Sequence, residues 1–158
     1  MPNNFDRRGI GLVETMVALL ILVVISSAVI LMTLEILSLT NASRLKNQAT
    51  TYAEEMVEKV RDAYQNYGYS AISAKGSPLG SCYAAVNGPP TSWSSLVSCP
   101  PADCNDPTTV IPGTIFYRYV KLVTPAGNSS VSVSSVVTWS EKGSCNRKEQ
   151  VDTYFYNY

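Results

Sequence analysis

The stretch RRGIGLVETMVALLILVVISSAVILMTLEIL, residues 7–37, decides the fold of this chain. Two arginines and a glycine precede a long apolar run, and one carboxylate, Glu14, stands at its front edge. From Thr15 to Leu34 there are 20 residues without a charge, and a helix of that length spans ~30 Å, the hydrocarbon thickness of a bilayer. The stretch therefore predicts a helix that crosses a membrane.

Two simple interpretations of this run compete. In a secretory signal peptide, Ser26, Ser27 and Ala28 would form the small-residue cleavage site, but the chain stays apolar beyond them. A plain single-helix anchor explains the length and the two arginines. Neither interpretation explains Gly9 and Glu14, although an ionisable group in an apolar span is costly and usually functional.

The segment RRGIGLVETMVALLILV, residues 7–23, resembles the leader and N-terminal helix of type IV prepilins and pseudopilins. In that family a short basic leader ends in glycine, an apolar residue follows, and glutamate is fifth in the mature chain. Counted from Ile10, Glu14 is fifth, whereas a cut after Gly11 would make it third. The resemblance implies cleavage between Gly9 and Ile10 by a prepilin peptidase, which also methylates the new N-terminus. Ile10 departs from the phenylalanine that is usual at this position.

A physical argument gives Glu14 a role after that cleavage. Cleavage leaves an α-amine on Ile10, and in a water-poor filament core the carboxylate of one subunit would pair with the amine of a neighbour. Breaking a buried ion pair costs about 3–5 kcal/mol, so the pair would set the axial register of the subunits. On position alone, Glu14 would be an interfacial carboxylate that the helix macrodipole favours.

Helical periodicity continues beyond the apolar run. Glu55 and Lys59 form a favourable i,i+4 pair, and no proline occurs between Ile10 and Gly76. Gly68 is a predicted C-terminal stop. An apolar stripe with spacings of three and four runs along one face, and it consists of Leu45, Ala49, Tyr52, Met56, Val60, Ala63 and Tyr67.

We therefore expect one long helix with two halves after a leader of residues 1–9. Residues 10–39 would lie in the membrane and later in the filament core. Residues 40–67 would be amphipathic, with the stripe packed under the outer domain or, alternatively, against a coiled-coil partner.

The remaining residues, 68–158, would form an exported globular domain. Residues 70–112 are dense in Pro, Gly, Asn, Asp and Ser, so we expect little regular structure there. Three alternating segments follow within about 114–158 and predict an antiparallel meander. The predicted fold class is α+β: a long N-terminal helix, membrane-spanning in its first half, packed on a C-terminal antiparallel sheet of about three strands. The resemblance to pilins implies the same architecture.

The alternation also predicts which side chains face the helix. Phe116, Val120 and Leu122 share one face of the first strand with Arg118. In the second strand the alternation slips near Ser134 and Ser135, which suggests a β-bulge.

Four cysteines in the outer domain predict disulfides, since an even number in a short exported domain is typical of them. Cys99 with Cys104 would close a small loop and leave Cys82 for Cys145, and the sequential pairing 82–99 with 104–145 is equally open. A zinc site is disfavoured, because gaps of 16, 4 and 40 residues lack the tight pairs of zinc ribbons. We expect no metal.

Composition argues against an enzyme. The chain contains no histidine, which removes the commonest general base and nucleophile partner. Its formal net charge is zero, so no basic field attracts nucleic acid. Ten tyrosines are expected to be half-buried sheet residues, with a sugar or nucleic-acid surface as the weaker alternative. We expect no catalytic residues and no cofactor.

Together these observations favour a minor pilin or pseudopilin of a type IV pilus or a related type II secretion or DNA-uptake filament. Arg7 and Arg8 place the N-terminus in the cytoplasm, with the outer domain beyond the cytoplasmic membrane and later in a cell-surface or periplasmic filament. The resemblance implies four partners: the prepilin peptidase and N-methyltransferase, other pilin subunits, an inner-membrane assembly platform and the lipid bilayer. The alternative is a single-pass, membrane-anchored exported binding domain.

Overall fold

The computed structural model of the chain describes residues 7–86, 88–96, 99, 108–127, 129–141 and 144–157. For residues 7–10, 85, 141 and 144–146 it describes the backbone alone. The chain divides into two compact units, residues 1–44 and residues 45–158.

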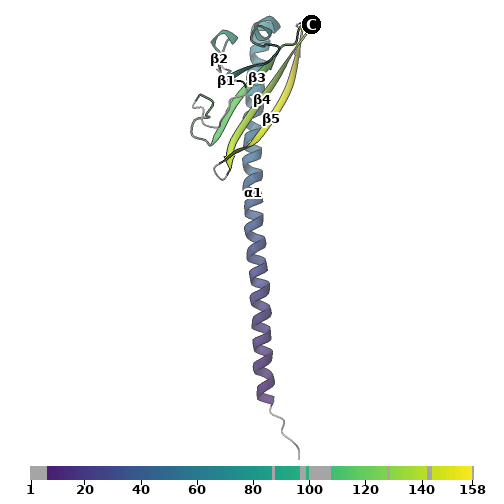
Figure 1. The fold of residues 1–158 in the computed structure, drawn as a ribbon, viewed down its shortest axis with the longest axis vertical. Coiled ribbons are helices and arrows are strands. Elements are labelled where there is room, and N and C mark those ends of the chain that lie inside the picture. Colours follow the sequence, from purple (N-terminus) through teal and green to yellow (C-terminus); the bar gives the residue numbers. More distant parts are fainter. Residues whose placement is uncertain are drawn as a thin grey trace, which may run out of the picture. The chain divides into compact units, whose positions relative to one another are not determined.

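Helix α1 covers Arg7–Ser73, so it begins three residues before the predicted start at Ile10 (Figure 1). At Gly68 the backbone leaves the helical region, with φ 80° and ψ 171°, and a short helical segment then completes the element. A positive φ strains residues that carry a Cβ but suits glycine. The break lies where the sequence placed the end of the helix.

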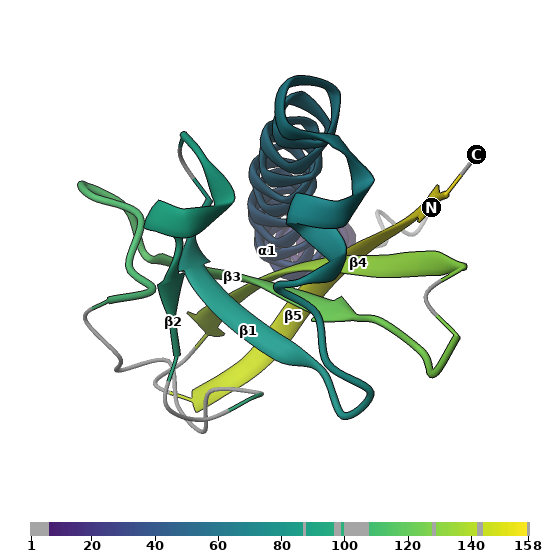
Figure 2. The same ribbon diagram turned by 90° about the horizontal axis from the view of Figure 1, so that it is seen from above.

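In the described part of the chain the sheet has five strands, and every neighbouring pair is antiparallel. In space the strands follow the order β2-β1-β3-β4-β5. Residues 45–73 of α1 lie over one face of the sheet (Figure 2). The predicted α+β class is therefore confirmed. The strands are β1 Ser81–Ala85, β2 Ser94–Ser95, β3 Phe116–Val123, β4 Ser130–Glu141 and β5 Ser144–Tyr156, and a short 3-10 helix, η1 Pro90–Ser92, lies between β1 and β2.

Strands β1 and β2 correct the predicted number of strands. The meander of three strands is β3, β4 and β5, whereas β1 and β2 lie in the turn-rich region that was expected to contain little regular structure. Strand β1 pairs with the free edge of β3, with Tyr83 opposite Val120. Tyr83 also meets Trp93 edge-on, with ring centroids 5.8 Å apart. These aromatic residues give two short strands enough buried surface to extend the sheet.

The core lies between the sheet and residues 45–73 of α1. One cluster surrounds Met56 and Val60, and a second surrounds Ala49 and Ala53. The predicted stripe fails at its end: Tyr67 is 47% exposed, and Tyr64 instead stacks on Phe155, with ring centroids 4.9 Å apart. The buried side chains that face α1 from the sheet include Phe116, Val120, Leu122, Val131, Val133, Val137, Trp139 and Phe155.

The predicted bulge near Ser134 and Ser135 is wrong. Strand β4 pairs without a register shift through both residues on either side, and the shift lies between Trp139 and Glu141 instead. Ser135 takes an inward position on the same face as the valines and is fully buried. A serine in an inward position breaks the hydrophobic pattern but not the backbone ladder, which explains the false signal.

Candidate functional site on the N-terminal helix

The backbone of residues 7–10 forms the start of α1. The side chains of Arg7, Arg8 and Ile10 lie outside the described part of the chain, so the predicted leader charges and the cut between Gly9 and Ile10 stay predictions. Gly11 is described, and a Cβ built on it meets nothing within 4 Å. The helix surface is therefore open one residue after the predicted mature N-terminus.

Glu14 is exposed on α1. No hydrogen bond or ion pair joins its side chain to another residue in the described ranges. It lies four residues, or ~6 Å along the axis, beyond Ile10. Among the residues that the structure describes, its carboxylate is therefore not engaged.

An apolar surface surrounds the helix beyond Glu14. Its large side chains from Leu12 to Leu39 are 52–67% exposed, and the helix is long and apolar enough to cross a membrane. A helix that is apolar on every side needs lipid or other apolar helices around it. The surface of this part of α1 has a shallow indentation, which is lined by Ala18, Ile21, Leu22, Ile25 and Ser26.

The hydroxyl groups on this segment are all satisfied within the helix. Each of the six serines and threonines from Thr15 to Thr40 donates to a carbonyl three or four residues earlier, as Ser26 does to Leu22 at 2.8 Å. Because hydrocarbon offers no hydrogen-bond partner, this arrangement suits a helix in a membrane or an apolar bundle. The donors are Thr15, Ser26, Ser27, Thr33, Ser38 and Thr40.

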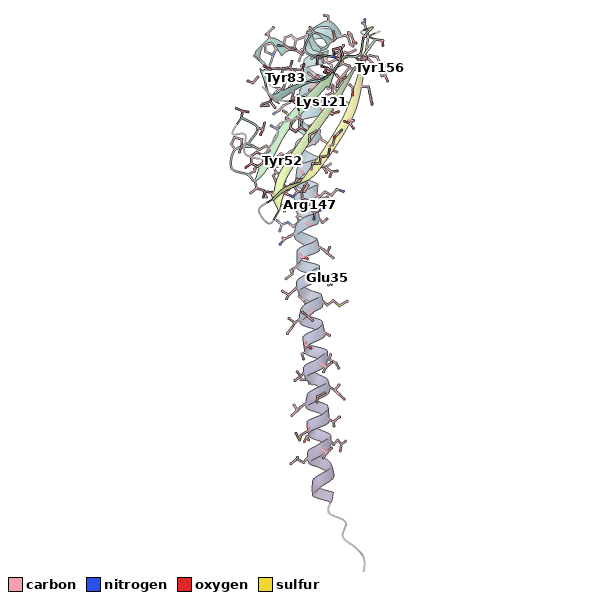
Figure 3. All side chains as sticks on the ribbon, in the orientation of Figure 1. Glu35, Tyr52, Tyr83, Lys121, Arg147 and Tyr156 are labelled. Atoms are coloured by element: carbon pink, nitrogen blue, oxygen red, sulfur yellow. A yellow bond between two sulfur atoms is a disulfide. The ribbon has the colours of Figure 1, made fainter. Side chains whose placement is uncertain are left out.

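Glu35 is a residue that the sequence reasoning missed. It is exposed on α1 and ends the uncharged run that begins after Glu14 (Figure 3). The two carboxylates are 21 residues apart, or ~31 Å along a helix, so they mark the two edges of a bilayer-sized apolar segment. The signal was present in the sequence as the far boundary of the uncharged run.

A network of ion pairs connects residues 45–73 of α1 to β3. The guanidinium of Arg118 donates to one oxygen of Glu55 at 3.0 Å, and Lys59 lies 2.7 Å from the other. The Lys59 hydrogen bond lowers the pKa of Glu55, and the charge of Arg118 adds to this effect, although partial burial opposes it. The predicted Glu55–Lys59 pair is confirmed, whereas the inward-facing Arg118 adds a contact between helix and sheet that was not predicted.

A disulfide joins Cys82 of β1 to Cys99, with a Cα–Cα distance of 5.3 Å. This is the sequential pairing, so the alternative that joins Cys99 to Cys104 is wrong, and no site made of four cysteine thiolates can form. Cys104 lies outside the described residues, as does the side chain of Cys145. Within the described ranges, no group of three metal-ligating side chains could hold a metal ion.

The tyrosines fit the expectation of half-buried sheet residues only in part, because Tyr154 and Tyr156 of β5 are exposed, and four others lie on α1: Tyr52, Tyr64, Tyr67 and Tyr69. The hydroxyl of Tyr83 donates to the Lys75 carbonyl at 2.7 Å, and that of Tyr64 donates to the Tyr156 carbonyl at 3.0 Å. Burial raises the pKa of Tyr83 and of Tyr119. These two hydrogen bonds join α1 and the segment after it to β1 and β5.

The fold, a long apolar N-terminal helix packed on an antiparallel sheet through residues 45–73, is compatible with the pilin-like architecture that the N-terminal segment implies. Comparisons with models of protein families, with curated proteins and with solved structures found no match.

Proposed function

We propose that the chain is a minor pilin or pseudopilin, a structural subunit of a type IV pilus or of a related type II secretion or DNA-uptake filament. The observation that carries the proposal is the order of basic leader, Gly9, Ile10 and Glu14 at the head of a continuous apolar helix. The α+β fold and the internally satisfied hydroxyl groups of the helix support it.

In this proposal the chain passes through the membrane before it assembles. The N-terminus stays in the cytoplasm, because Arg7 and Arg8 precede the apolar segment. A prepilin peptidase cuts between Gly9 and Ile10 and methylates the new amine. An inner-membrane assembly platform then transfers the helix from lipid into a bundle with other pilin subunits, and the protein performs no catalysis of its own.

Glu14 has a defined task in that bundle. Its carboxylate is exposed, and it binds the Ile10 amine of a neighbouring subunit, because removing both charges from water is tolerable only when they are paired. The competing function, a membrane-anchored binding domain, needs neither the cut nor this pair.

The experiment that tests the proposal co-expresses the full chain with a prepilin peptidase and follows its length. The wild type should lose its leader, and Gly9→Val should stay full length because the peptidase needs close access to the backbone at the cut. Gly11→Val is the matched control, since a Cβ fits there without any neighbour, and it should still be cut after Gly9. A wild-type chain that stays uncut, or Gly9→Val that is cut normally, would reject the proposal.

A further inference from the structure

Glu35 and Arg44 are two opposite charges that lack a partner on the N-terminal unit. Both are exposed, and no charged residue stands between them in the sequence. No ion pair or hydrogen bond joins either side chain to another residue within the described ranges. The Ser38 hydroxyl donates to the backbone carbonyl of Glu35 and not to its carboxylate.

Helix geometry prevents the two groups from meeting within one chain. They are nine residues apart, which is ~13.5 Å along the axis and about two and a half turns, so they point to opposite faces. Positions three and four residues from Glu35 carry no cation, and those around Arg44 carry no acid. The neighbouring side chains are Leu31, Met32, Ser38 and Leu39 for Glu35, and Thr40, Asn41, Asn47 and Gln48 for Arg44.

We propose that Glu35 of one copy binds Arg44 of a second copy, whose α1 runs parallel and is displaced along the axis by up to nine residues. Parallel copies related by a head-to-tail contact meet through two different faces of the same helix. Charges on opposite faces are the arrangement that such a contact between two neighbouring copies requires.

This inference rests on the proposed function, and the two ion pairs agree on the direction of displacement. Pairing the Ile10 amine of the displaced copy with Glu14 of the first requires a shift of four residues. Pairing Glu35 of the displaced copy with Arg44 of the first requires nine, in the same direction. By the same helix geometry, Glu14 and Arg44 are 30 residues apart and lie about 120° from each other around the helix, so the two pairs are made with two different neighbours that are shifted in the same direction.

The surroundings favour a second copy over lipid as the partner of Glu35. The carboxylate stands at the edge of an apolar surface, and lipid phosphates carry the same sign of charge. Once the helices leave the bilayer and exclude water, an unpaired carboxylate and an unpaired guanidinium both become costly. A neighbour that carries the complementary charge at the opposite face satisfies both.

The test reverses and then exchanges the charges in the full chain. Assembly is measured as the chain recovered in sheared filaments, relative to the chain in membranes. Glu35→Arg and Arg44→Glu should each reduce filament incorporation at least about tenfold, because like charges would face each other between copies. The double variant Glu35→Arg/Arg44→Glu should restore most of it. Lys46→Glu combined with Glu35→Arg is the control, and it should restore nothing. Because Lys46 lies 4.0 Å from Glu149, Lys46→Glu alone is measured beside it and should assemble at the wild-type level.

The outcomes separate this inference from the function on which it rests. If the wild type is neither cut nor assembled, both proposals fail. If the wild type assembles and the charge exchange does not restore the single reversals, the Glu35–Arg44 contact is rejected while the filament role stands. If Arg44→Glu reduces filament incorporation and Glu35→Gln leaves it unchanged, Arg44 binds lipid phosphate instead, and the contact is again rejected.

Discussion

Replacing Ser135 by alanine should stabilise the domain of residues 45–158. The Ser135 hydroxyl is fully buried on the helix-facing side of β4, with no hydrogen-bond partner in the described part of the chain. Its cross-strand neighbours are Val120 of β3 and Val151 of β5, which offer no side-chain acceptor. The hydroxyl therefore loses its hydrogen bonds to water on folding without replacing them.

The magnitude follows from that loss. A buried polar group without a partner costs about 1–3 kcal/mol, and removing one oxygen atom forfeits a few van der Waals contacts. We expect Ser135→Ala to raise the free energy of unfolding by about 1 kcal/mol, which corresponds to roughly 4 °C in Tm for a domain of this size. Ser134→Ala, one residue away on the opposite, partly exposed face, should change stability by less than about 0.5 kcal/mol.

The assay is urea unfolding of the full chain in detergent with its disulfides intact. Trp93 and Trp139 are both buried, so their fluorescence reports the loss of the core. If Ser135→Ala is less stable than the wild type by more than about 0.5 kcal/mol, the hydroxyl has a partner and the reasoning fails.

Arg118→Met should cost about 1 kcal/mol of unfolding free energy. Because the Lys59 hydrogen bond and the charge of Arg118 lower the pKa of Glu55 in the folded state, this difference should be complete above pH 4.5 and should shrink as the pH falls through the folded value, to what the hydrogen bond from Arg118 to the Tyr52 carbonyl contributes; urea titrations at a series of pH values would show this. Glu14→Ala should leave membrane insertion and leader cleavage intact but abolish filament incorporation; incorporation at the wild-type level would contradict the pairing with the Ile10 amine. Because Cys82 and Cys99 are joined, peptide mapping of the unreduced protein should find the two remaining cysteines of the chain linked to each other, and a free thiol there would contradict this.

Long periodic elements were predictable from the sequence because one physical signal dominates each of them. The apolar run, the stripe through Met56 and Val60, and the alternation of β3 all reflect burial of one face. Gly68 predicted the break in α1, since glycine adopts a φ of 80° without the strain that residues with a Cβ would have there. Strands β1 and β2 were not predictable in this way, because they are too short to show an alternation of apolar and polar residues.

Details that depend on tertiary contacts were predicted less well. Tyr67 and Tyr64 fit a helical stripe about equally, but Tyr64 is the one that stacks on Phe155 and is partly buried, whereas Tyr67 is exposed. Arg118 can face the helix because its guanidinium forms an ion pair with Glu55 of α1, a contact that the sequence alone does not show. At the candidate site, the spacing of Gly9 and Glu14 could be recognised in the sequence itself. A role for Glu35 could be inferred only once the structure showed that Glu35 and Arg44 are both exposed on the helix.

The mass of the mature N-terminus tests the central claim most directly. The protein purified from membranes of cells that contain a prepilin peptidase should begin at Ile10 and carry one methyl group on its α-amine, as measured by mass spectrometry of the N-terminal peptide. A chain that begins at Met1, or one that begins after Ala28 as a cleaved signal peptide would leave it, would contradict the account.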